Sequence, residues 1–206
     1  MNNSILIVGS GGHAVSCINL LEEIGSFKIQ GLIGLREEVG KRIFGYEVIG
    51  TDTEIKELYS LAKNIAIGVG QIRDSYLRSK LFDNYLLNGF NIPSLISPFA
   101  KLAKDVEVAN GVQIFGGSII NKGVKIGKNS IINTGAVLEH NVIIEENCHV
   151  STRVVVNGNV RVSARSFIGS NSVLRQNIVI GENSFVAMGQ ALTVSLSENS
   201  VYGVNK

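Results

Sequence analysis

The sequence predicts an α/β domain followed by a parallel β-helix, and two observations carry this prediction. From Leu102 onward, every sixth residue is aliphatic over sixteen positions in succession. Before that array, short apolar runs alternate with segments of helical spacing, which is the pattern of a small parallel α/β domain. Pro93 and Pro98 separate the two patterns, so we place the boundary near residue 95, with domains 1–95 and 96–206.

The α/β prediction rests on the order of the elements in the first domain. An apolar run at 5–8 predicts a strand, and a glycine turn and a helical pattern ending at Ile24 follow it. Further strands are predicted at 28–33 and 64–69, and a helix at 72–87. Alternation of this kind places the strands in one parallel sheet with helices against it.

The six-residue period is the strongest signal in the sequence. Its members are all aliphatic: Leu102, Val108, Ile114, Ile120, Ile126, Ile132, Leu138, Ile144, Val150, Val156, Val162, Ile168, Leu174, Ile180, Val186 and Leu192. The residue four positions after each aliphatic residue is small or β-branched as far as Ser184. The residue three positions after is often Asn or Gly, which tolerate a positive φ at a turn. The pattern resembles the hexapeptide repeat of the left-handed parallel β-helix, in which three hexapeptides form one 18-residue coil.

Composition and charge exclude several classes of protein. Of the 206 residues, 45% are hydrophobic and 17% charged, with a net charge of +2, which excludes intrinsic disorder. With 19 basic against 17 acidic residues, the chain lacks the basic density of a nucleic-acid binder. No apolar run approaches the roughly 18 residues of a membrane span, and the run 5–8 is too short for a signal-peptide core. We therefore expect a cytoplasmic protein with no membrane partner.

The glycine turn after the first strand suggests a nucleotide site, because backbone N–H groups at a helix start can approach a pyrophosphate. Gly9 and Gly11 match the dinucleotide-binding pattern, but Ala14 holds the third glycine position. An acidic residue about 20 positions further on, which would bind the ribose of NAD, is not evident either. NAD is therefore disfavoured, and a tight turn without a ligand is the alternative.

Two of the three histidines, His140 and His149, lie within the repeat. His140 stands two residues after Leu138, at an outward turn, where simple surface exposure is the alternative to a function. Gly158 follows 18 residues later and stacks over His140 at about 4.8 Å. A base beside a backbone N–H suits acyl transfer to an amine, which needs a proton acceptor and a donor for the developing oxyanion.

The runs 132–140 (INTGAVLEH), 148–151 (CHVS) and 9–13 (GSGGH) resemble a known family along essentially the whole chain. It comprises the sialic acid O-acetyltransferases and the bacillosamine-type N-acetyltransferases, which act on UDP-linked 4-amino sugars. The resemblance implies a Rossmann-like domain that holds a nucleotide-linked amino sugar, a left-handed β-helix, and a homotrimer that binds acetyl-CoA between subunits. It implies no metal.

The resemblance also assigns roles to single residues. It makes His140 the general base and the Gly158 N–H the donor to the thioester oxygen of acetyl-CoA, and places Asn141 where the family has an acidic orienting residue. It places three further residues at acetyl-CoA: His149, Met188 and Gly189. Its substrate-binding residues are Gly9, Gly11, Gly12, His13, Gly68, Gln71, Arg73 and Asn133. With Asn141 in the acidic position, Glu139 or Glu145 could orient His140 instead.

The leading hypothesis is an acetyl-CoA-dependent N-acetyltransferase acting on the C4 amine of a nucleotide-linked 4-amino-4,6-dideoxy sugar, in surface polysaccharide (lipopolysaccharide or O-antigen) biosynthesis. Neither Cys17 nor Cys148 is placed to act as a nucleophile, so direct attack by the amine is expected. The alternatives are an O-acetyltransferase of a sialic-acid-like sugar, a β-helical zinc hydratase, which would need a third histidine in the prism, and a non-catalytic nucleotide-sugar-binding relative. The sequence does not choose among UDP, dTDP, GDP and CMP carriers.

The homotrimer implies apolar prism faces. We expect five outward aliphatic residues to be exposed in the single chain, and to be hidden by trimerisation: Ile119, Ile131, Ile143, Val155 and Val173.

Overall fold

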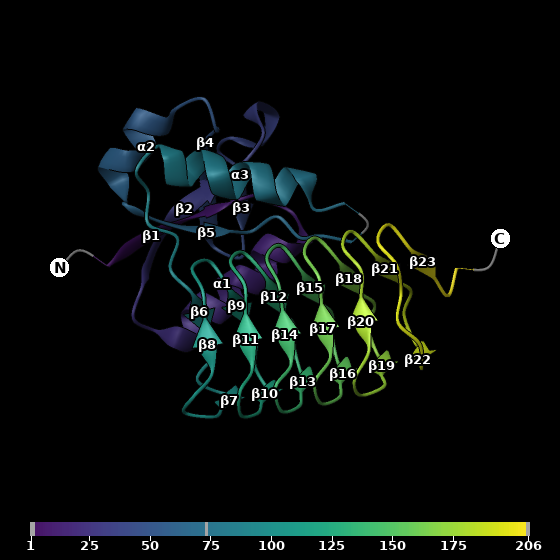
Figure 1. Ribbon diagram of the computed structural model, residues 1–206. Coiled ribbons are helices and arrows are strands. Elements are labelled where there is room, and N and C mark those ends of the chain that lie inside the picture. The colour runs from purple at the N-terminus through teal and green to yellow at the C-terminus, as the bar shows by residue number, and fades with distance from the viewer. Residues whose placement is uncertain (1–2, 73, 205–206) are drawn as a thin grey trace. The chain divides into compact units, whose positions relative to one another are not determined.

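The computed structural model describes residues 3–72 and 74–204 and divides the chain into two compact units. The first unit comprises Met1–Gly70 and Tyr76–Leu95, and the second comprises Gln71–Ser75 and Ile96–Lys206. The first is an α/β unit and the second a left-handed β-helix of hexapeptide repeats, which confirms the predicted fold class (Figure 1). Within the described residues, no helix has the length and apolar character that crossing a bilayer requires.

The α/β unit is built on a five-stranded sheet in the order β3-β4-β2-β1-β5. Its strands are β1 (Ser4–Val8), β2 (Lys28–Ile33), β3 (Arg42–Ile43), β4 (Tyr46–Gly50) and β5 (Asn64–Ile67). Its helices are α1 (Gly12–Ile24), the 3₁₀-helix η1 (Arg36–Glu38), α2 (Ile55–Leu61) and α3 (Tyr76–Leu87). Every strand pair is parallel except β3–β4.

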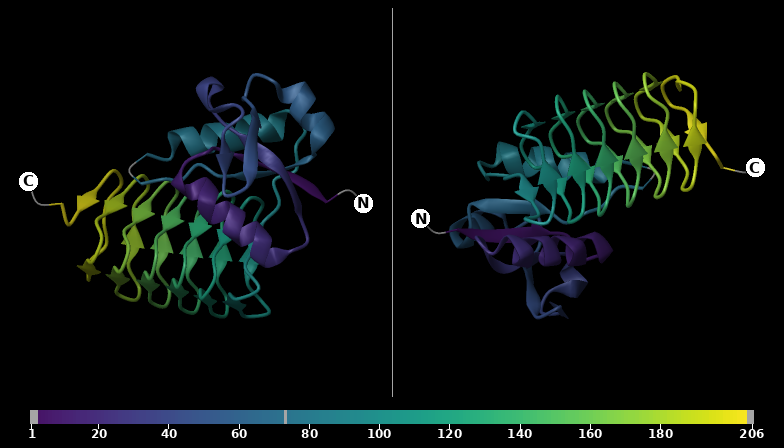
Figure 2. Two further views of the ribbon diagram at one scale, coloured as in Figure 1. Left: turned by 180° about the vertical axis from the view of Figure 1, so that it is seen from behind. Right: turned by 90° about the horizontal axis from the view of Figure 1, so that it is seen from below.

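Helices cover both faces of this sheet, so that β1 is buried at every position. Leu6 and Val8 pack in one cluster with residues of α2 and α3, among them Leu58 and Phe82. Cys17 of α1 lies 3.9 Å from the carbonyl oxygen of Ile67 at the end of β5. Helix α1 therefore packs on one face of the sheet, and α2 and α3 on the other, as the left view of Figure 2 shows for α1.

The predicted elements of this unit are found, but two of their ends differ. Strand β5 ends at Ile67 rather than at 69, and α3 begins at Tyr76 rather than at 72. The described residues before this helix, at 71, 72, 74 and 75, have no regular structure and belong to the second unit, so the helix starts later than the spacing predicted. The β3–β4 hairpin was not predicted, because β3 has only two residues; its turn places Phe44 and Gly45 at positive φ.

The β-helix consists of two-residue strands joined by tight corners, and its coils lie side by side in Figures 1 and 2. One sheet contains β7 (Lys101–Leu102), β10 (Ile119–Ile120), β13 (Val137–Leu138), β16 (Val155–Val156), β19 (Val173–Leu174) and β22 (Ala191–Leu192). The second contains β8 (Glu107–Val108), β11 (Lys125–Ile126), β14 (Ile143–Ile144), β17 (Arg161–Val162) and β20 (Val179–Ile180). The third contains β6 (Leu95–Ile96), β9 (Gln113–Ile114), β12 (Ile131–Ile132), β15 (His149–Val150), β18 (Phe167–Ile168), β21 (Phe185–Val186) and β23 (Val201–Tyr202).

Neighbouring strands from β7 to β22 pair in parallel register 18 residues apart, as Ile119 does with Val137. All sixteen aliphatic positions point into the prism, where fourteen are buried and the first two, Leu102 and Val108, pack against the end of the core. Four buried serines of the repeat, Ser118, Ser130, Ser166 and Ser172, donate to backbone carbonyls 15 residues later, as Ser130 does to Glu145 at 2.8 Å. The interior therefore contains few polar atoms, and the hydroxyls at its edge are hydrogen-bonded.

The corners explain the Asn and Gly content of the second unit. Every sixth residue from Gly111 to Gly189 has a positive φ, between 55° and 73°. Gly or Asn occupies twelve of these fourteen corners, and Arg153 and Arg165 occupy the other two. Glycine and asparagine adopt this left-handed conformation at low cost, so they fix where each coil turns.

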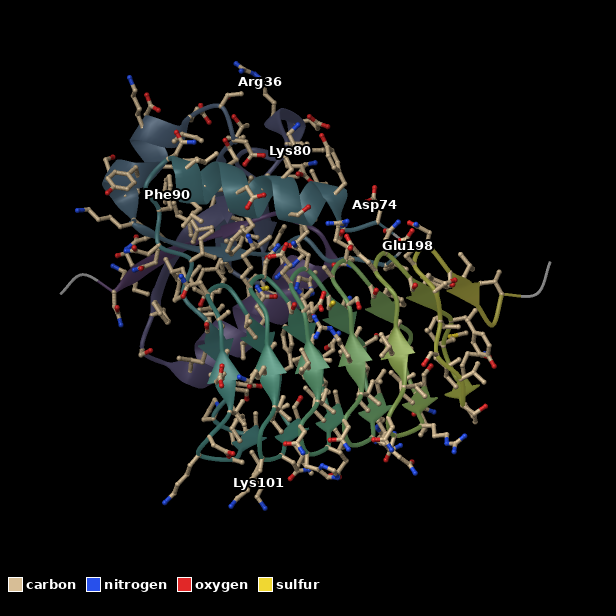
Figure 3. All side chains as sticks on the ribbon, viewed as in Figure 1. Arg36, Asp74, Lys80, Phe90, Lys101 and Glu198 are labelled. Carbon is tan, nitrogen blue, oxygen red and sulfur yellow. The ribbon has the colours of Figure 1, made fainter. Side chains whose placement is uncertain are left out.

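The outward faces of the prism differ in character. On the sheet that contains β10, an aliphatic face is formed by Ile119, Val137, Val155, Val173 and Ala191. It begins at Lys101, which points away from the prism (Figure 3). Ile143 is half-buried on the second sheet, between Lys125 and Arg161.

The expected exposure of Ile131 is wrong, because this side chain is fully buried. It lies between Gln113 and His149 in the ladder of the third sheet, and both of these are buried as well. The segment that begins at Gln71 contacts this sheet at His149. The carbonyl oxygen of Gln71 lies 2.6 Å from Nδ1 of the imidazole.

Candidate active site

His140 lies at an exposed corner of the prism, directly against Gly158 of the next coil. The backbone N–H of Asn159 donates to the carbonyl oxygen of His140 at 3.0 Å, which fixes the two corners in register. A Cβ on Gly158 would lie 2.5 Å from both Cε1 and Nε2 of the imidazole. Only glycine therefore leaves room for the ring here, and the stacking expected from the 18-residue spacing is present.

The side chain beside Nδ1 of His140 is that of Asn141. Its Nδ2 lies 3.3 Å from Nδ1 of His140, and its backbone has a φ of 59°. Glu145, one of the two carboxylates considered for this role, is held elsewhere: it accepts from Nε of Arg161 at 2.6 Å and from the N–H of Ala164 at 2.9 Å. Nε2, the other ring nitrogen of His140, faces Gly158.

A second group forms around His149 on β15. Its Nδ1 lies 2.6 Å from the carbonyl oxygen of Gln71, and its Nε2 lies 3.2 Å from Nδ2 of Asn133. A carbonyl oxygen only accepts, so Nδ1 carries the proton and Nε2 accepts from Asn133. The ring also packs edge-on against Phe167. The structure thus joins three residues that the sequence assigned to acetyl-CoA and to the sugar, and these roles stay predictions.

Neither cysteine is available as a nucleophile. Cys17 and Cys148 are both fully buried. Burial raises the pKa of the Cys148 thiol to about 12, so the reactive thiolate is not populated near neutral pH.

The glycine loop of the α/β unit lines a cavity of about 400 Å³. Gly9, Gly11, Gly12, His13 and Gly68, all assigned to substrate binding, border it. Gly9 has a φ of 111°, and a Cβ there would lie 3.0 Å from the carbonyl oxygen of Gly68, so glycine is required where β1 passes β5. Gly11 is the N-cap of α1 and makes no side-chain hydrogen bond, so no side chain of the cap residue covers the first turn of the helix.

Two carboxylates in this cavity were not evident from the sequence. Glu38 accepts from the Ser10 hydroxyl at 2.6 Å and from the N–H of Leu35 at 2.8 Å. The Ser10 hydrogen bond, followed by that of Leu35, lowers the pKa of Glu38, so it is ionised at neutral pH. Asp52 accepts from the Tyr85 hydroxyl at 2.5 Å. Glu38 follows Gly11 by 27 residues rather than about 20, so the spacing rule did not find it.

Two predicted residues, Met188 and Gly189, lie apart from these groups. Met188 and Gly189 are exposed at the corner after β21, whereas His140 stands at the corner after β13 in a different sheet. Within one chain, the two corners belong to different edges of the prism. Arg73 lies outside the described residues.

The described residues bring no three His, Cys, Asp or Glu side chains together as metal ligands. The zinc-hydratase hypothesis, which needs three histidines, gains no support from the arrangement of His140 and His149.

Family models match both units of the chain. The PglD N-terminal domain matches residues 4–85. The model described as bacterial transferase hexapeptide (six repeats) matches 123–158, and the hexapeptide repeat of succinyl-transferase matches 159–193. No curated protein gives a significant sequence match.

Solved structures resemble the whole chain. A variant of perosamine N-acetyltransferase from Caulobacter crescentus with a histidine replaced by asparagine, in complex with CoA and GDP-perosamine, is 26% identical with a TM-score of 0.90. The similarity covers 97% of this chain and 93% of that one. The acetyltransferase domain of PglB from Neisseria gonorrhoeae FA1090 is 23% identical with a TM-score of 0.85, covering 98% of this chain and 97% of that one, and this likeness concerns the fold.

WeeI from Acinetobacter baumannii AYE has the same fold at 20% identity and a TM-score of 0.84, with 97% of both chains covered. The resemblance drawn from the sequence is thus confirmed over both units. The chain thus combines a match to the PglD N-terminal domain with matches to hexapeptide repeats of the bacterial transferase and succinyl-transferase types.

Proposed function

We propose that the protein is an acetyl-CoA-dependent N-acetyltransferase that acetylates the C4 amine of a nucleotide-linked 4-amino-4,6-dideoxy sugar. The observation that carries the proposal is the corner at which His140 stacks on Gly158. It is supported by the 26% identity, over 97% of the chain, to a perosamine N-acetyltransferase in complex with CoA and GDP-perosamine.

In the proposed reaction, the lone pair of the sugar amine attacks the thioester carbonyl carbon, and the carbon–sulfur bond breaks. Nε2 of His140 takes the proton from the attacking nitrogen and passes it to the departing CoA sulfur. The Gly158 N–H, which donates to no acceptor among the described residues, stabilises the negative charge on the carbonyl oxygen. The burial of Cys148 fits a direct transfer without a covalent enzyme intermediate.

An amine is favoured over a hydroxyl as the acceptor because Asn141, a neutral side chain, faces Nδ1 of His140. A carboxylate there would stabilise the imidazolium that forms when the base takes a proton, and an amide does so less. A sugar amine is partly deprotonated near neutral pH, so it depends less on a strong base than a hydroxyl does.

The cavity of the α/β unit is the proposed site of the nucleotide, with the diphosphate at the N-terminus of α1. Glu38 and Asp52 favour a guanine base there. An ionised carboxylate only accepts hydrogen bonds, and guanine offers two adjacent donors, N1–H and N2–H, on one edge. Uracil and thymine offer one N–H that lies between two carbonyl oxygens. A carboxylate repels these oxygens, so it suits these bases less well. A GDP-linked sugar is also what the similar Caulobacter crescentus protein binds.

The proposed assembly is a homotrimer that binds acetyl-CoA between subunits, with the aliphatic face in contact with a second copy. Ile119 and Val173 are 40% and 44% exposed on this face, and an apolar stripe of this kind is costly to leave in water. Such an assembly would allow Met188 and Gly189 of one chain to act beside His140 of another.

Thiol release from acetyl-CoA tests the proposal, with GDP-, UDP-, dTDP- and CMP-linked 4-amino-4,6-dideoxy sugars as acceptors and a sialic-acid-like sugar in parallel. We expect turnover with an amino sugar, highest with the GDP-linked one, and N-acetylated product by mass spectrometry. Turnover with the hydroxyl acceptor alone would make the protein an O-acetyltransferase. Tight binding of a nucleotide sugar without thiol release would make it a non-catalytic relative.

A further inference from the structure

Asn141 is one end of a column of asparagines that runs along the same edge of the prism. Nδ2 of Asn141 lies 3.3 Å from Oδ1 of Asn159, and Nδ2 of Asn159 lies 3.0 Å from Oδ1 of Asn177. The three residues are 18 positions apart and all have φ between 59° and 62°. Each amide therefore meets the next in an equivalent position one coil further along, and we call this column the asparagine ladder.

The ladder has a direction, and its direction reaches His140. In the structure each amide NH₂ group points to the following oxygen, and the NH₂ group of Asn141 also points to Nδ1 of His140. An NH₂ group only donates, so Nδ1 accepts, and the proton of the neutral ring is then on Nε2. In this direction, the nitrogen that faces Gly158 holds a proton and cannot accept another.

A half-turn of each amide reverses the ladder without losing a hydrogen bond. The NH₂ group of Asn177 then donates to Asn159, and that of Asn159 donates to Oδ1 of Asn141. Oδ1 of Asn141 now faces Nδ1 of His140, which donates its proton to it, and Nε2 becomes the acceptor. The two directions differ in which ring nitrogen can act as a base.

We propose that the asparagine ladder positions His140 and selects its tautomer, and that acetyl transfer proceeds from the reversed direction, in which Asn159 donates toward Asn141. This inference rests on the proposed function for its kinetic consequence and on the ladder alone for the tautomer. Asn141, Asn159 and Asn177 are positioning residues, because each acts through His140.

The same substitution at two rungs of the ladder gives a sharp test. An aspartate only accepts, so Asn141→Asp draws the proton to Nδ1 of His140 and turns Asn159 to donate, which fixes the reversed direction. Asn159→Asp instead draws the NH₂ group of Asn141 toward itself, which leaves the proton on Nε2. Both variants add one negative charge near His140, so each controls for a general electrostatic effect of the other.

The kinetic readout is kcat with acetyl-CoA and the best acceptor. We expect Asn141→Asp to raise kcat, because it fixes the direction from which transfer proceeds, and Asn159→Asp to lower kcat by about tenfold to a hundredfold, within what a general base contributes. KM values should change little. Asn177→Asp, two coils from His140, should lower kcat in the same sense as Asn159→Asp. Equal thermal midpoints show that the corners, where aspartate tolerates positive φ, remain folded.

The spectroscopic readout is independent of turnover. The chain has only three histidines, so ¹⁵N-labelled imidazole resonances can be assigned with a His140→Gln variant. Protonated and unprotonated ring nitrogens resonate far apart, and we expect protonated Nδ1 in Asn141→Asp and protonated Nε2 in Asn159→Asp. The same tautomer in both variants, or equal effects of both on kcat, would overturn the inference. Opposite tautomers in a protein that releases no thiol would sustain the ladder and remove the proposed function instead.

Discussion

His140 stands at a corner of the prism and His149 stands on strand β15, and the two imidazoles have opposite surroundings. His140 is exposed, contacts Asn141 at one nitrogen and presents the other to Gly158. His149 is 7% exposed, and both of its nitrogens are held, by Gln71 and Asn133. Burial and full hydrogen bonding thus fix a histidine in one state, whereas a proton acceptor needs a nitrogen that remains open.

Replacement of His140 should have the largest kinetic effect. His140→Ala removes the proposed base, and we expect kcat to fall by about 10²- to 10⁴-fold, with little change in the thermal midpoint because the side chain is exposed. Steady-state thiol release and differential scanning calorimetry measure the two quantities. Unchanged turnover would remove His140 from the chemistry.

Gly158→Ala should disturb the same corner from the other side. The new Cβ would lie 2.5 Å from two atoms of the imidazole, so the ring must move away from its position. We expect kcat to fall by about tenfold to a hundredfold, since the base is displaced rather than removed. The corner of the following hexapeptide already carries a Cβ, at Ala164, so Ala164→Gly is a matched control that should leave kcat unaltered. A Gly158→Ala enzyme with normal kcat would show that the ring position is not critical.

His149→Ala should affect stability more than activity, which is the opposite of His140→Ala. It leaves the Gln71 carbonyl without its donor and opens a space beside Phe167, which together cost about 2–4 kcal/mol of unfolding free energy. Urea denaturation measures this loss, and kcat should fall by less than in His140→Ala. If the stability of His149→Ala were unchanged and its KM for acetyl-CoA rose sharply, His149 would bind acetyl-CoA, as the family resemblance implies, and would not be a structural residue.

The smallest effects should separate the inside of the prism from its aliphatic face. Ile120 is 1% exposed and Ile119, its neighbour, is 40% exposed. We expect Ile120→Val to cost about 0.5–1.5 kcal/mol in the free energy of unfolding, and Ile119→Val to cost less than about 0.5 kcal/mol when the chain is monomeric. A larger cost of Ile119→Val in the assembled protein is what the proposed contact with a second copy predicts.

A charge placed on the aliphatic face tests directly whether a second copy of the chain covers this face. In sedimentation, the unmodified protein should have a mass of about 66 kDa, three times the 22.1 kDa of the chain. Ile119→Asp should shift the mass toward the monomer, because the contact would bury an unpaired carboxylate. A monomeric unmodified protein would contradict the trimer and the shared acetyl-CoA site.

The predictable parts of the molecule are those that repeat. The aliphatic period defines the coil, and a coil of 18 residues is enough to place Gly158 on His140. Features that depend on a single contact between residues far apart in the sequence were not predicted. Glu38 reaches the cavity only because η1 folds back from the end of β2, and no period in the sequence indicates this.

The asparagine ladder was open to prediction, since Asn141, Asn159 and Asn177 stand 18 positions apart. The contact of Asn141 with Nδ1 of His140 was not, because it depends on side-chain rotation at an exposed corner. The segment Gln71–Ser75 shows the same limit for the fold. Its helical spacing predicted part of α3, but a hydrogen bond to His149 places it in the other unit.

The 18-residue register limits how this chain can change its length. A duplicated hexapeptide would keep an aliphatic residue at every sixth position, yet it would carry all later residues one face further around the axis. Inserted between His140 and Thr152, it would bring Thr152, which has a Cβ, over the imidazole in place of Gly158. A duplicated coil beyond Gly158 would leave every edge intact. Evolution can therefore extend this prism most readily in steps of three repeats.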